Sequence, residues 1–494
     1  MTIDERQPLL ANGTTNTHPT KPPSEPPPPP TADPNNPQTW RHTYKLLLVL
    51  LLALMAFTVT FTCISLVPLS PSIIASLDTL SGTPSTTYAS ILLITIWELG
   101  EAAGPLLIAP LSEVYGRAPV FHAANALFIL STAAAALSRS TGWLVLMRFI
   151  TGVSVASNVL NPAVIGDLFK PEERGRAMSL VMLTPLMGGA IGPAVAGAVA
   201  QGLGWRAVLW MSVGLAVVVE GLFLVLFRET YLPAILRNRL QSERSEGKVD
   251  EGDYEDAALE ELKVQPKSLI WQSIKRPATI FAGSFVLQIM SLYGAVMFSF
   301  FYIVSTTLPG ILQDRYGFPP ALVGSSFLSF SIGSLLGILV NNTLLDKIYL
   351  RLTPANSLHS IPENRLPLTI LGAFTLPLTI ILYGFSASLH LPYPIVLLAV
   401  LLMGFTIMLG LVPMMSYIVD AFGVYSASAL TAVLITRCLM STVLPLAVAP
   451  LEQRWGYGWG MTVLAGLGLG LAPVPWVVMR WGGRWRQGCE FSKG

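Results

Sequence analysis

Charged residues are scarce in this sequence. Asp, Glu, Lys and Arg make up 12% of the 494 residues, whereas 52% are hydrophobic and the mean hydropathy is +0.60. So few charges in so apolar a chain exclude an ordinary soluble protein and indicate a polytopic membrane protein. The formal net charge of +2 lacks the basic excess of a phosphate-binding surface, so we expect no nucleic acid partner.

Several chemical signatures are also missing. The three cysteines, Cys63, Cys438 and Cys489, are far apart in the sequence and predict neither a disulfide framework nor a metal site. No phosphate-binding loop of the form G-x-x-x-x-G-K-S/T, no nucleophile elbow and no cluster of metal ligands occurs. We therefore expect no ATP hydrolysis, no enzymatic activity, no metal and no cofactor.

Apolar segments of roughly 20 residues, which is enough to cross a bilayer, recur along the rest of the chain. Six lie at 45–67, 86–110, 118–138, 142–167, 176–201 and 206–227, and six more at 279–305, 320–345, 366–386, 392–419, 427–449 and 459–480. The pattern predicts an all-α protein of twelve transmembrane helices, with six-helix halves at 45–228 and 278–481. A polar linker at 229–277 joins the halves.

The two ends of the chain are polar. Residues 1–44 are rich in proline and predict a disordered tail, and residues 482–494 form a second, short tail. The N-terminal tail lacks the tripartite build of a cleaved signal peptide, so we expect the first membrane helix to act as an uncleaved insertion signal. Most Lys and Arg fall in the tails, the linker and the even-numbered loops, which predicts that both termini and the linker are cytoplasmic.

The fifth predicted helix contains an uncharged run with very few large side chains, Thr184–Gln201. Its glycines and proline fall at helical spacings and would let another helix approach the backbone closely. These residues are Gly188, Gly189, Gly192, Pro193 and Gly197. A tight packing helix is the simpler interpretation, but the pattern G-x-x-x-G-P-x-x-G resembles the antiporter motif of major facilitator superfamily exporters.

The loop between the second and third predicted helices reads APLSEVYGRAPV. It resembles the signature G-x-L-a-D-r-x-G-r-k of the same superfamily, with Ala109 in place of the first glycine and Ala118 in place of the last basic residue. The resemblance implies a cytoplasmic latch, and ordinary positive-inside charge is the alternative. Its expected members are Glu113, Gly116, Arg117, Asp167 at the end of helix four and Asp420 at the end of helix ten.

Helix four carries an intramembrane arginine, Arg148, which with Gly152 and Ala156 matches the superfamily pattern R-x-x-x-G-x-x-x-A. A guanidinium inside a membrane is costly unless it meets water or a partner. Asn158 and Asn161 lie loosely on the same side, so this side is expected to face an aqueous cavity. By resemblance Arg148 influences proton movement, and a structural hydrogen-bond donor is the alternative.

Two carboxylates lie three residues apart on helix two, Glu98 and Glu101. They share one helix face, and two like charges in a low dielectric favour the state in which one carboxyl holds a proton. We therefore expect them to carry protons, although pairing of Glu98 with Arg148 or Arg437 would give it a structural role instead.

Helix seven carries a stripe of flexible and aromatic side chains that suits apolar ligands of varied shape. Packing or a lipid-facing surface is the alternative. The stripe is included with Arg437 in the expected cavity, whose members are Asn158, Asn161, Met290, Tyr293, Met297 and Arg437.

Three further segments resemble fungal drug-proton antiporters of the superfamily: Asp33–Lys45, the RETYLP at 228–233, and Tyr417–Pro450. The resemblance implies a proton-coupled exporter of small lipophilic compounds such as drugs, toxins or secondary metabolites. Its two pseudo-symmetric six-helix bundles would work by alternating access in the plasma membrane, or alternatively the vacuolar membrane, as a monomer. A nutrient symporter or facilitator, and a receptor or scaffold without transport, are the other hypotheses.

Overall fold

The structure is a computed structural model that describes residues 36–82, 88–245, 266–352, 361–489 and 491. Most of the predicted N-terminal tail and the middle of the linker lie outside these residues. The described residues form helices and connecting turns, with no strand among them. The fold is therefore all-α, as predicted.

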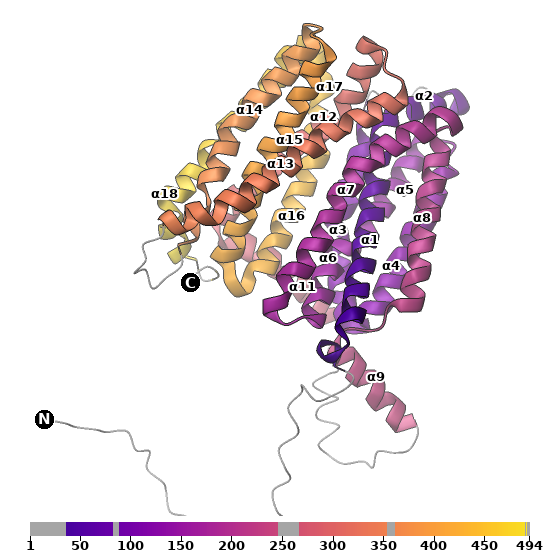
Figure 1. Ribbon diagram of the computed structural model, residues 1–494, viewed down its shortest axis with the longest axis vertical. Helices are drawn as coiled ribbons and strands as arrows, with labels where there is room; N and C mark the ends of the chain where they lie inside the picture. The colour runs from indigo at the N-terminus through magenta and orange to yellow at the C-terminus, as the bar shows by residue number, and fades with distance from the viewer. Residues whose placement is uncertain (1–35, 83–87, 246–265, 353–360, 490, 492–494) are drawn as a thin grey trace, which may run out of the picture.

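The N-terminal half, coloured indigo to magenta in Figure 1, lies beside the orange to yellow C-terminal half. The first half consists of α1 (His42–Ser65), α2 (Ser70–Ser81), α3 (Ala89–Tyr115), α4 (Arg117–Ala136), α5 (Thr141–Val153), α6 (Ser157–Leu168), α7 (Pro171–Leu203) and α8 (Trp205–Leu226). The connection contains α9 (Leu232–Ser245) and α11 (Pro266–Gly283). The second half consists of α12 (Phe285–Tyr316), α13 (Pro320–Leu352), the 3-10 turn η4 (Pro362–Arg365), α14 (Pro367–Ser388), α15 (Tyr393–Phe422), α16 (Ser426–Val443), α17 (Val448–Leu471) and α18 (Pro473–Gln487).

Eleven stretches of the described residues are long and apolar enough to cross a membrane. The last of them, Ser426–Gln487, has 62 residues and contains α16, α17 and α18. At about 1.5 Å per residue that is far more than one bilayer needs, and Gly456 interrupts α17 with φ 74° and ψ 173°. We count two passes in this stretch, which gives the twelve transmembrane segments that the sequence predicts.

Three predicted elements differ in detail. Helix four is two helices, because the chain leaves the α-helical path at Ser154–Ala156 between α5 and α6. The first membrane helix continues through a 3-10 turn, Val67–Leu69, into α2. The middle of α2 is bound to α8, because Trp205 Nε1 donates to Ser76 Oγ at 2.9 Å. The linker is partly helical, since α9 and most of α11 fall inside its predicted bounds.

Each half contains a crossing of two helices whose backbones are in close contact. In the N-terminal half, a Cβ on Gly100 would strike the carbonyl of Phe149, and one on Gly152 would strike that of Trp97. In the C-terminal half, α13 and α15 repeat this arrangement with Gly333 and Gly404. Such crossings pack tightly without relying on a hydrophobic driving force, so they suit a rigid bundle in lipid.

The halves meet along two helix pairs, α7 with α13 and α3 with α16. Contacts between the halves also lie toward the end of the molecule that carries α2, where Gln313 Nε2 donates to the Pro68 carbonyl at 3.3 Å. The opposite end, where α9 lies in Figure 1, is called the linker end below.

Candidate functional site

Two buried acids of α3 are bound by side chains of the other half. The Tyr302 hydroxyl of α12 donates to Glu98 Oε1 at 2.6 Å. Arg437 Nη2 of α16 lies 3.2 Å from Glu101 Oε1. Glu98 is 2% exposed and Glu101 9% exposed, so water stabilises neither charge well. The predicted carboxylate pair is therefore placed on the boundary between the halves.

Within the N-terminal half, Asn158 contacts Glu101 and Trp97 contacts Arg148. Asn158 Nδ2 of α6 donates to Glu101 Oε1 at 2.7 Å, so this oxygen has a donor from each half. Trp97 stacks against Arg148, with the guanidinium carbon 4.6 Å from the ring centroid. We name Glu98, Glu101, Tyr302, Asn158 and Arg437 the cross-half cluster.

Arg148 itself is 2% exposed and donates to backbone carbonyls. Its Nη2 reaches the Cys63 carbonyl at 2.8 Å and its Nη1 the Thr62 carbonyl at 3.3 Å, both on α1. These bonds tie α5 to α1 within one half and are those expected of a structural donor. An influence of Arg148 on proton movement stays a prediction.

The cross-half cluster also brings a thiol close to the acids. Ligand atoms of Glu98, Glu101 and Cys438 lie within 4.8 Å of one another. Hydrogen-bond donors already occupy an oxygen of each carboxylate. Arg437 adds a positive charge beside them, which disfavours a cation at the same place. The arrangement therefore fits proton exchange better than metal binding.

One oxygen of the cluster lacks a partner. Glu98 Oε2 is buried and accepts no hydrogen bond from the described residues, and Arg437 Nε is likewise a buried donor without an acceptor among them. Buried polar atoms without partners cost free energy. A change of protonation or the polar groups of a ligand could satisfy them, so this cluster is the best candidate for coupling and binding.

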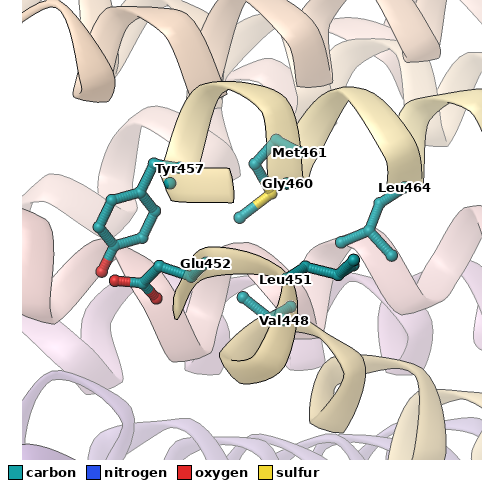
Figure 2. A pocket seen from close by; sticks show the side chains of 8 residues that line it. Val448, Leu451, Glu452, Tyr457, Gly460, Met461 and Leu464 are labelled. Carbon is teal, nitrogen blue, oxygen red and sulfur yellow. The ribbon is translucent and has the colours of Figure 1, made fainter. Parts of the chain in front are cut away.

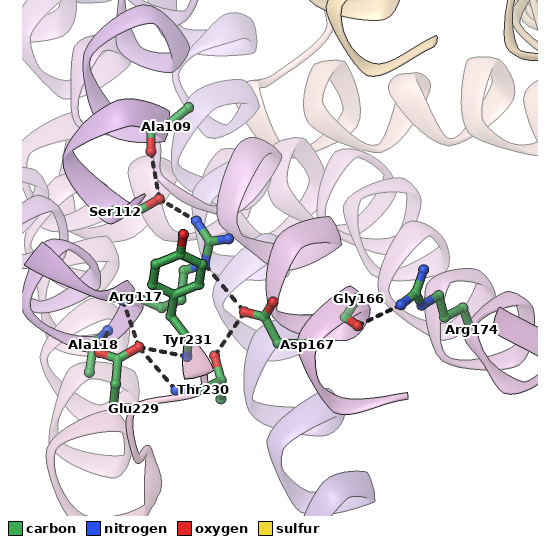
Figure 3. A network of polar contacts seen from close by, with 10 residues as sticks. All are labelled: Ala109, Ser112, Arg117, Ala118, Gly166, Asp167, Arg174, Glu229, Thr230 and Tyr231. Carbon is green, nitrogen blue, oxygen red and sulfur yellow. Dashed lines mark hydrogen bonds and ion pairs between the residues drawn. The ribbon is translucent and has the colours of Figure 1, made fainter. Parts of the chain in front are cut away.

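A second polar network lies at the linker end of the N-terminal half (Figure 3). Arg117 Nε lies 3.3 Å from Asp167 Oδ2, and Arg117 Nη1 donates to Ser112 Oγ at 2.6 Å. Tyr231 covers the guanidinium, whose carbon lies 4.7 Å from the ring centroid. Burial raises the pKa of Tyr231, so this phenol stays neutral. Two predicted latch residues, Arg117 and Asp167, therefore lie together.

Glu229 caps this network, and the sequence indicated it only through the RETYLP resemblance. Its carboxylate accepts from the backbone N–H of Arg117 at 2.8 Å and of Ala118 at 3.0 Å (Figure 3). A carboxylate at the first turn of α4 is favoured because it satisfies free N–H groups and the helix dipole. Gly116 has φ 101°, and a Cβ there would strike Glu229, so glycine is required at this position. Glu113 is exposed and forms no ion pair with Arg117.

The C-terminal half has a similar network. Asp420, at the end of α15, pairs with Arg365 Nε of η4, and Asp346 of α13 lies 3.5 Å from Arg365 Nη1. Glu363 Oε1 accepts from Arg486 Nε of α18 at 3.2 Å. In this conformation Asp420 therefore pairs with a residue of its own half. Its part in a latch stays a prediction.

The remaining predicted cavity residues are packed. Met290, Tyr293 and Met297 are at most 1% exposed and belong to the core of the C-terminal half. Asn161 Nδ2 donates to the Leu52 carbonyl at 3.3 Å, which joins α6 to α1. Residues that only pack the core would be buried in this way, as the alternative interpretation expects. A role of these residues in substrate binding stays a prediction.

The glycines of the predicted antiporter motif face two different helices, α1 and α13. Gly188 and Gly192 face α1, where a Cβ would lie 2.9 Å and 3.3 Å from the carbonyls of Phe57 and Phe61, and Gly189 faces Ile64. Gly197 instead faces the other half, because its Cβ would strike the Pro320 carbonyl of α13. The contact is reciprocal: a Cβ on Gly324 would strike the Pro193 carbonyl.

A small pocket lies at the kink of α17 (Figure 2). Glu452 and Tyr457 form its polar side, and Val448, Leu451, Met461 and Leu464 its apolar side. Its lining comes from one helix, and none of the predicted site residues takes part. It is therefore separate from the cross-half cluster.

Known proteins resemble this chain in sequence and in fold. The sequence profile of the Major Facilitator Superfamily matches residues 46–445. Efflux pump radE of Floropilus chiversii is 32% identical over 92% of this chain and 84% of its own. MFS transporter prlG of Fungal sp. (strain NRRL 50135) is 35% identical over 91% of this chain and 94% of its own.

Solved structures share the fold at lower identity. The D-xylose-proton symporter has a TM-score of 0.65 at 17% identity and covers 88% of this chain and 97% of its own. The human organic anion transporter MFSD10 has a TM-score of 0.58 at 19% identity and covers 88% of this chain and 100% of its own. At these identities the likeness concerns the fold alone.

Proposed function

Because the chain belongs to the Major Facilitator Superfamily, and is thus an integral membrane transporter of small molecules, we propose that it is a proton-coupled exporter of small lipophilic organic compounds. Export is supported by the similarity to fungal efflux pumps. Coupling is supported by one observation above all: the buried Glu101 is bound to Arg437 across the boundary between the halves.

The chemistry follows from what must happen when the halves rock. Alternating access separates the halves on one side at a time, so the Glu101–Arg437 and Glu98–Tyr302 contacts are strained or broken in part of the cycle. A carboxylate that loses its guanidinium in a low dielectric is stabilised by taking up a proton. Protonation of Glu101 in turn removes the attraction between the halves, so proton binding and the movement of the halves are coupled.

The exchange then runs in one order. On the outer side Glu101 takes up a proton as the substrate leaves, and on the inner side it releases the proton as the next substrate binds. Since Glu98 Oε2 and Arg437 Nε have no partner among the described residues, they are the atoms to which a polar group of the substrate would bind. Apolar parts of the substrate would contact the rings around the cluster, such as Phe298, which lies 4.3 Å from the Arg437 guanidinium carbon.

The proposed setting is the plasma membrane, with both termini and the linker in the cytoplasm and the protein acting as a monomer. The excess of Lys and Arg at the linker end supports this orientation.

The test has two stages. Fluorescent lipophilic compounds are first screened for lower accumulation in cells that contain the protein. A compound that passes is then followed in reconstituted vesicles under an imposed pH gradient, with substrate efflux and proton flux recorded together. Protons that move against the substrate support antiport. Protons that move with it would indicate a symporter, and substrate movement without protons a facilitator.

A further inference from the structure

The last helix, α18, is held at the linker end by one of its faces. Pro475, Val478 and Gly482 are buried, and a Cβ on Gly482 would lie 3.6 Å from Glu363 of η4. Arg486 Nε adds its bond to Glu363 Oε1 at 3.2 Å. This face therefore fixes the helix against the C-terminal half.

The surface of α18 outside this buried face carries arginines and tryptophans. Arg480 and Arg484 are four residues apart, hence on one side of the helix, and both are exposed. Trp476 is 50%, Trp481 39% and Trp485 36% exposed. We name these five residues the α18 face.

The rings of the α18 face have defined positions. Trp476 and Trp481 meet edge to face with ring centroids 5.8 Å apart. Trp485 meets Phe285, at the start of α12, with centroids 5.4 Å apart. Tryptophan is enriched where the apolar part of a bilayer meets its headgroups. The rings therefore place this part of α18 at the headgroup level of the membrane.

The two arginines carry charge that the described part of the protein does not neutralise. Arg486 is paired with Glu363, whereas neither Arg480 nor Arg484 forms an ion pair with a described residue. A guanidinium binds phosphate or carboxylate oxygens with two parallel hydrogen bonds. At the depth set by the tryptophans, lipid headgroups supply such anions, and basic residues at this level favour anionic over zwitterionic lipids.

We propose that the α18 face is a binding site for an anionic phospholipid of the phosphatidylserine class. Arg480 and Arg484 bind the headgroup anions, and the tryptophan rings cover the upper part of the acyl chains. The helix that carries the site is bound to η4 through Arg486 and Glu363, and Arg365 of η4 binds Asp420. The site is therefore connected to the polar network at the linker end of the C-terminal half.

The experiment measures lipid binding to the purified full-length protein by native mass spectrometry. The protein in detergent is titrated with phosphatidylserine or with phosphatidylcholine of the same acyl chains. We expect preferential binding of phosphatidylserine, and about tenfold weaker binding of it in the R480Q/R484Q variant. The matched control is K347Q/R351Q, which removes two exposed basic residues from the linker end of α13 and should leave the affinity within about twofold.

Two further measurements keep the test decisive if the double variant does not fold. R480K/R484K keeps both charges and should keep the preference for phosphatidylserine, although with lower affinity because lysine cannot form the paired hydrogen bonds. Binding to the unmodified protein should weaken as salt is raised. Equal binding of the two lipids, an unchanged affinity in R480Q/R484Q, or an equal loss in the control variant would each overturn the proposal.

Discussion

Glu101 of α3 and Arg437 of α16 lie in different halves of the molecule, and their side chains meet at 3.2 Å. The other ion pairs described above join residues of the same half. The contact is partly shielded from water, with side-chain exposures of 11% for Glu101 and 21% for Arg437. We expect a charge pair in this position to respond both to protonation and to movement of the halves, and this expectation leads to the first two predictions.

The first prediction concerns titration at Glu101. The Glu101→Gln variant keeps the size of the side chain and can still bond Asn158, but it cannot exchange a proton. We expect export against a gradient to fall about tenfold or more and its pH dependence to flatten, because the halves lose a charge pair that protonation can break. Paired efflux and proton-flux measurements in vesicles provide the test.

The matched control for Glu101 is Glu173→Gln, which neutralises an exposed carboxylate at the start of α7. It should transport like the unmodified protein. If Glu101→Gln exports with an unchanged pH profile, the carboxylate is structural and the proton is carried elsewhere.

The second prediction concerns stability. Arg437→Gln leaves two buried carboxylates without their guanidinium, so we expect the protein to lose about 3 kcal/mol of stability. Adding Glu101→Gln should restore part of the loss, because the second change removes the unpaired charge. Thermal unfolding of the two single variants and the double variant in detergent gives this cycle. Additive effects of the two substitutions would show that they are not energetically coupled.

The sequence contained the members of this pair but not their pairing. A charged residue within an apolar run is conspicuous, so Glu98, Glu101, Arg148 and Arg437 could be picked out directly. The contact between Glu101 and a residue 336 positions away could not be predicted, because contacts between helices depend on how the halves pack. Tyr302 was missed for a related reason: it stands in the aromatic run FSFFY, where nothing local separates one ring from the next.

Helices were predicted well and their irregularities were not. Twelve apolar runs mark the membrane segments because their length is set by the bilayer. The break between α5 and α6 contains no proline, so no local signal marked it. The latch illustrates the same limit. Asp167 was among the expected partners of Arg117 and pairs with it, but Glu113, which is nearer in sequence, does not, and Glu229 caps the turn.

The third prediction follows from this pairing. Arg117→Asp and Asp167→Arg each place two like charges together and should lower transport about tenfold by weakening the linker end of the N-terminal half. The double variant exchanges the charges and should recover part of the activity. Recovery is expected to be incomplete because Arg117 also bonds Ser112 and stacks on Tyr231.

Glu113→Gln serves as the control for the latch, since Glu113 is exposed and not paired with Arg117. Transport rates at equal protein amounts in the membrane decide the outcome. A double variant no better than the single variants, or a large loss in Glu113→Gln, would contradict the pairing.

The fourth prediction concerns orientation. An epitope tag inserted at Gly247, in the part of the linker outside the described residues, should be hidden from antibody in intact cells and reached after permeabilisation. A tag at Gly82 should be reached in intact cells, because the turn after α2 lies at the opposite end and a Cβ there would meet nothing within 4 Å. Labelling in the reverse pattern would show that the termini are outside.

The fifth prediction concerns the contact between α7 and α13. Gly197→Ala adds one methyl group that strikes the Pro320 carbonyl, so the halves must move apart. We expect normal insertion, reduced export and a proton leak, because the close contact that seals this boundary is lost. Gly324→Ala should have the same effect from the other side, through Pro193.

Two control variants distinguish the effect of this contact from the general effects of substituting glycine by alanine. Gly202→Ala lies in the same helix, where a Cβ would meet nothing within 4 Å, and alanine favours a helix over glycine by about 1 kcal/mol, so it should be neutral or stabilising. Gly188→Ala adds its methyl group inside one half, 2.9 Å from the Phe57 carbonyl, and should lower thermal stability without a leak. Substrate efflux and proton flux recorded in the same vesicles distinguish these results. Tight, fully coupled export by both Gly197→Ala and Gly324→Ala would show that the seal lies elsewhere along the boundary.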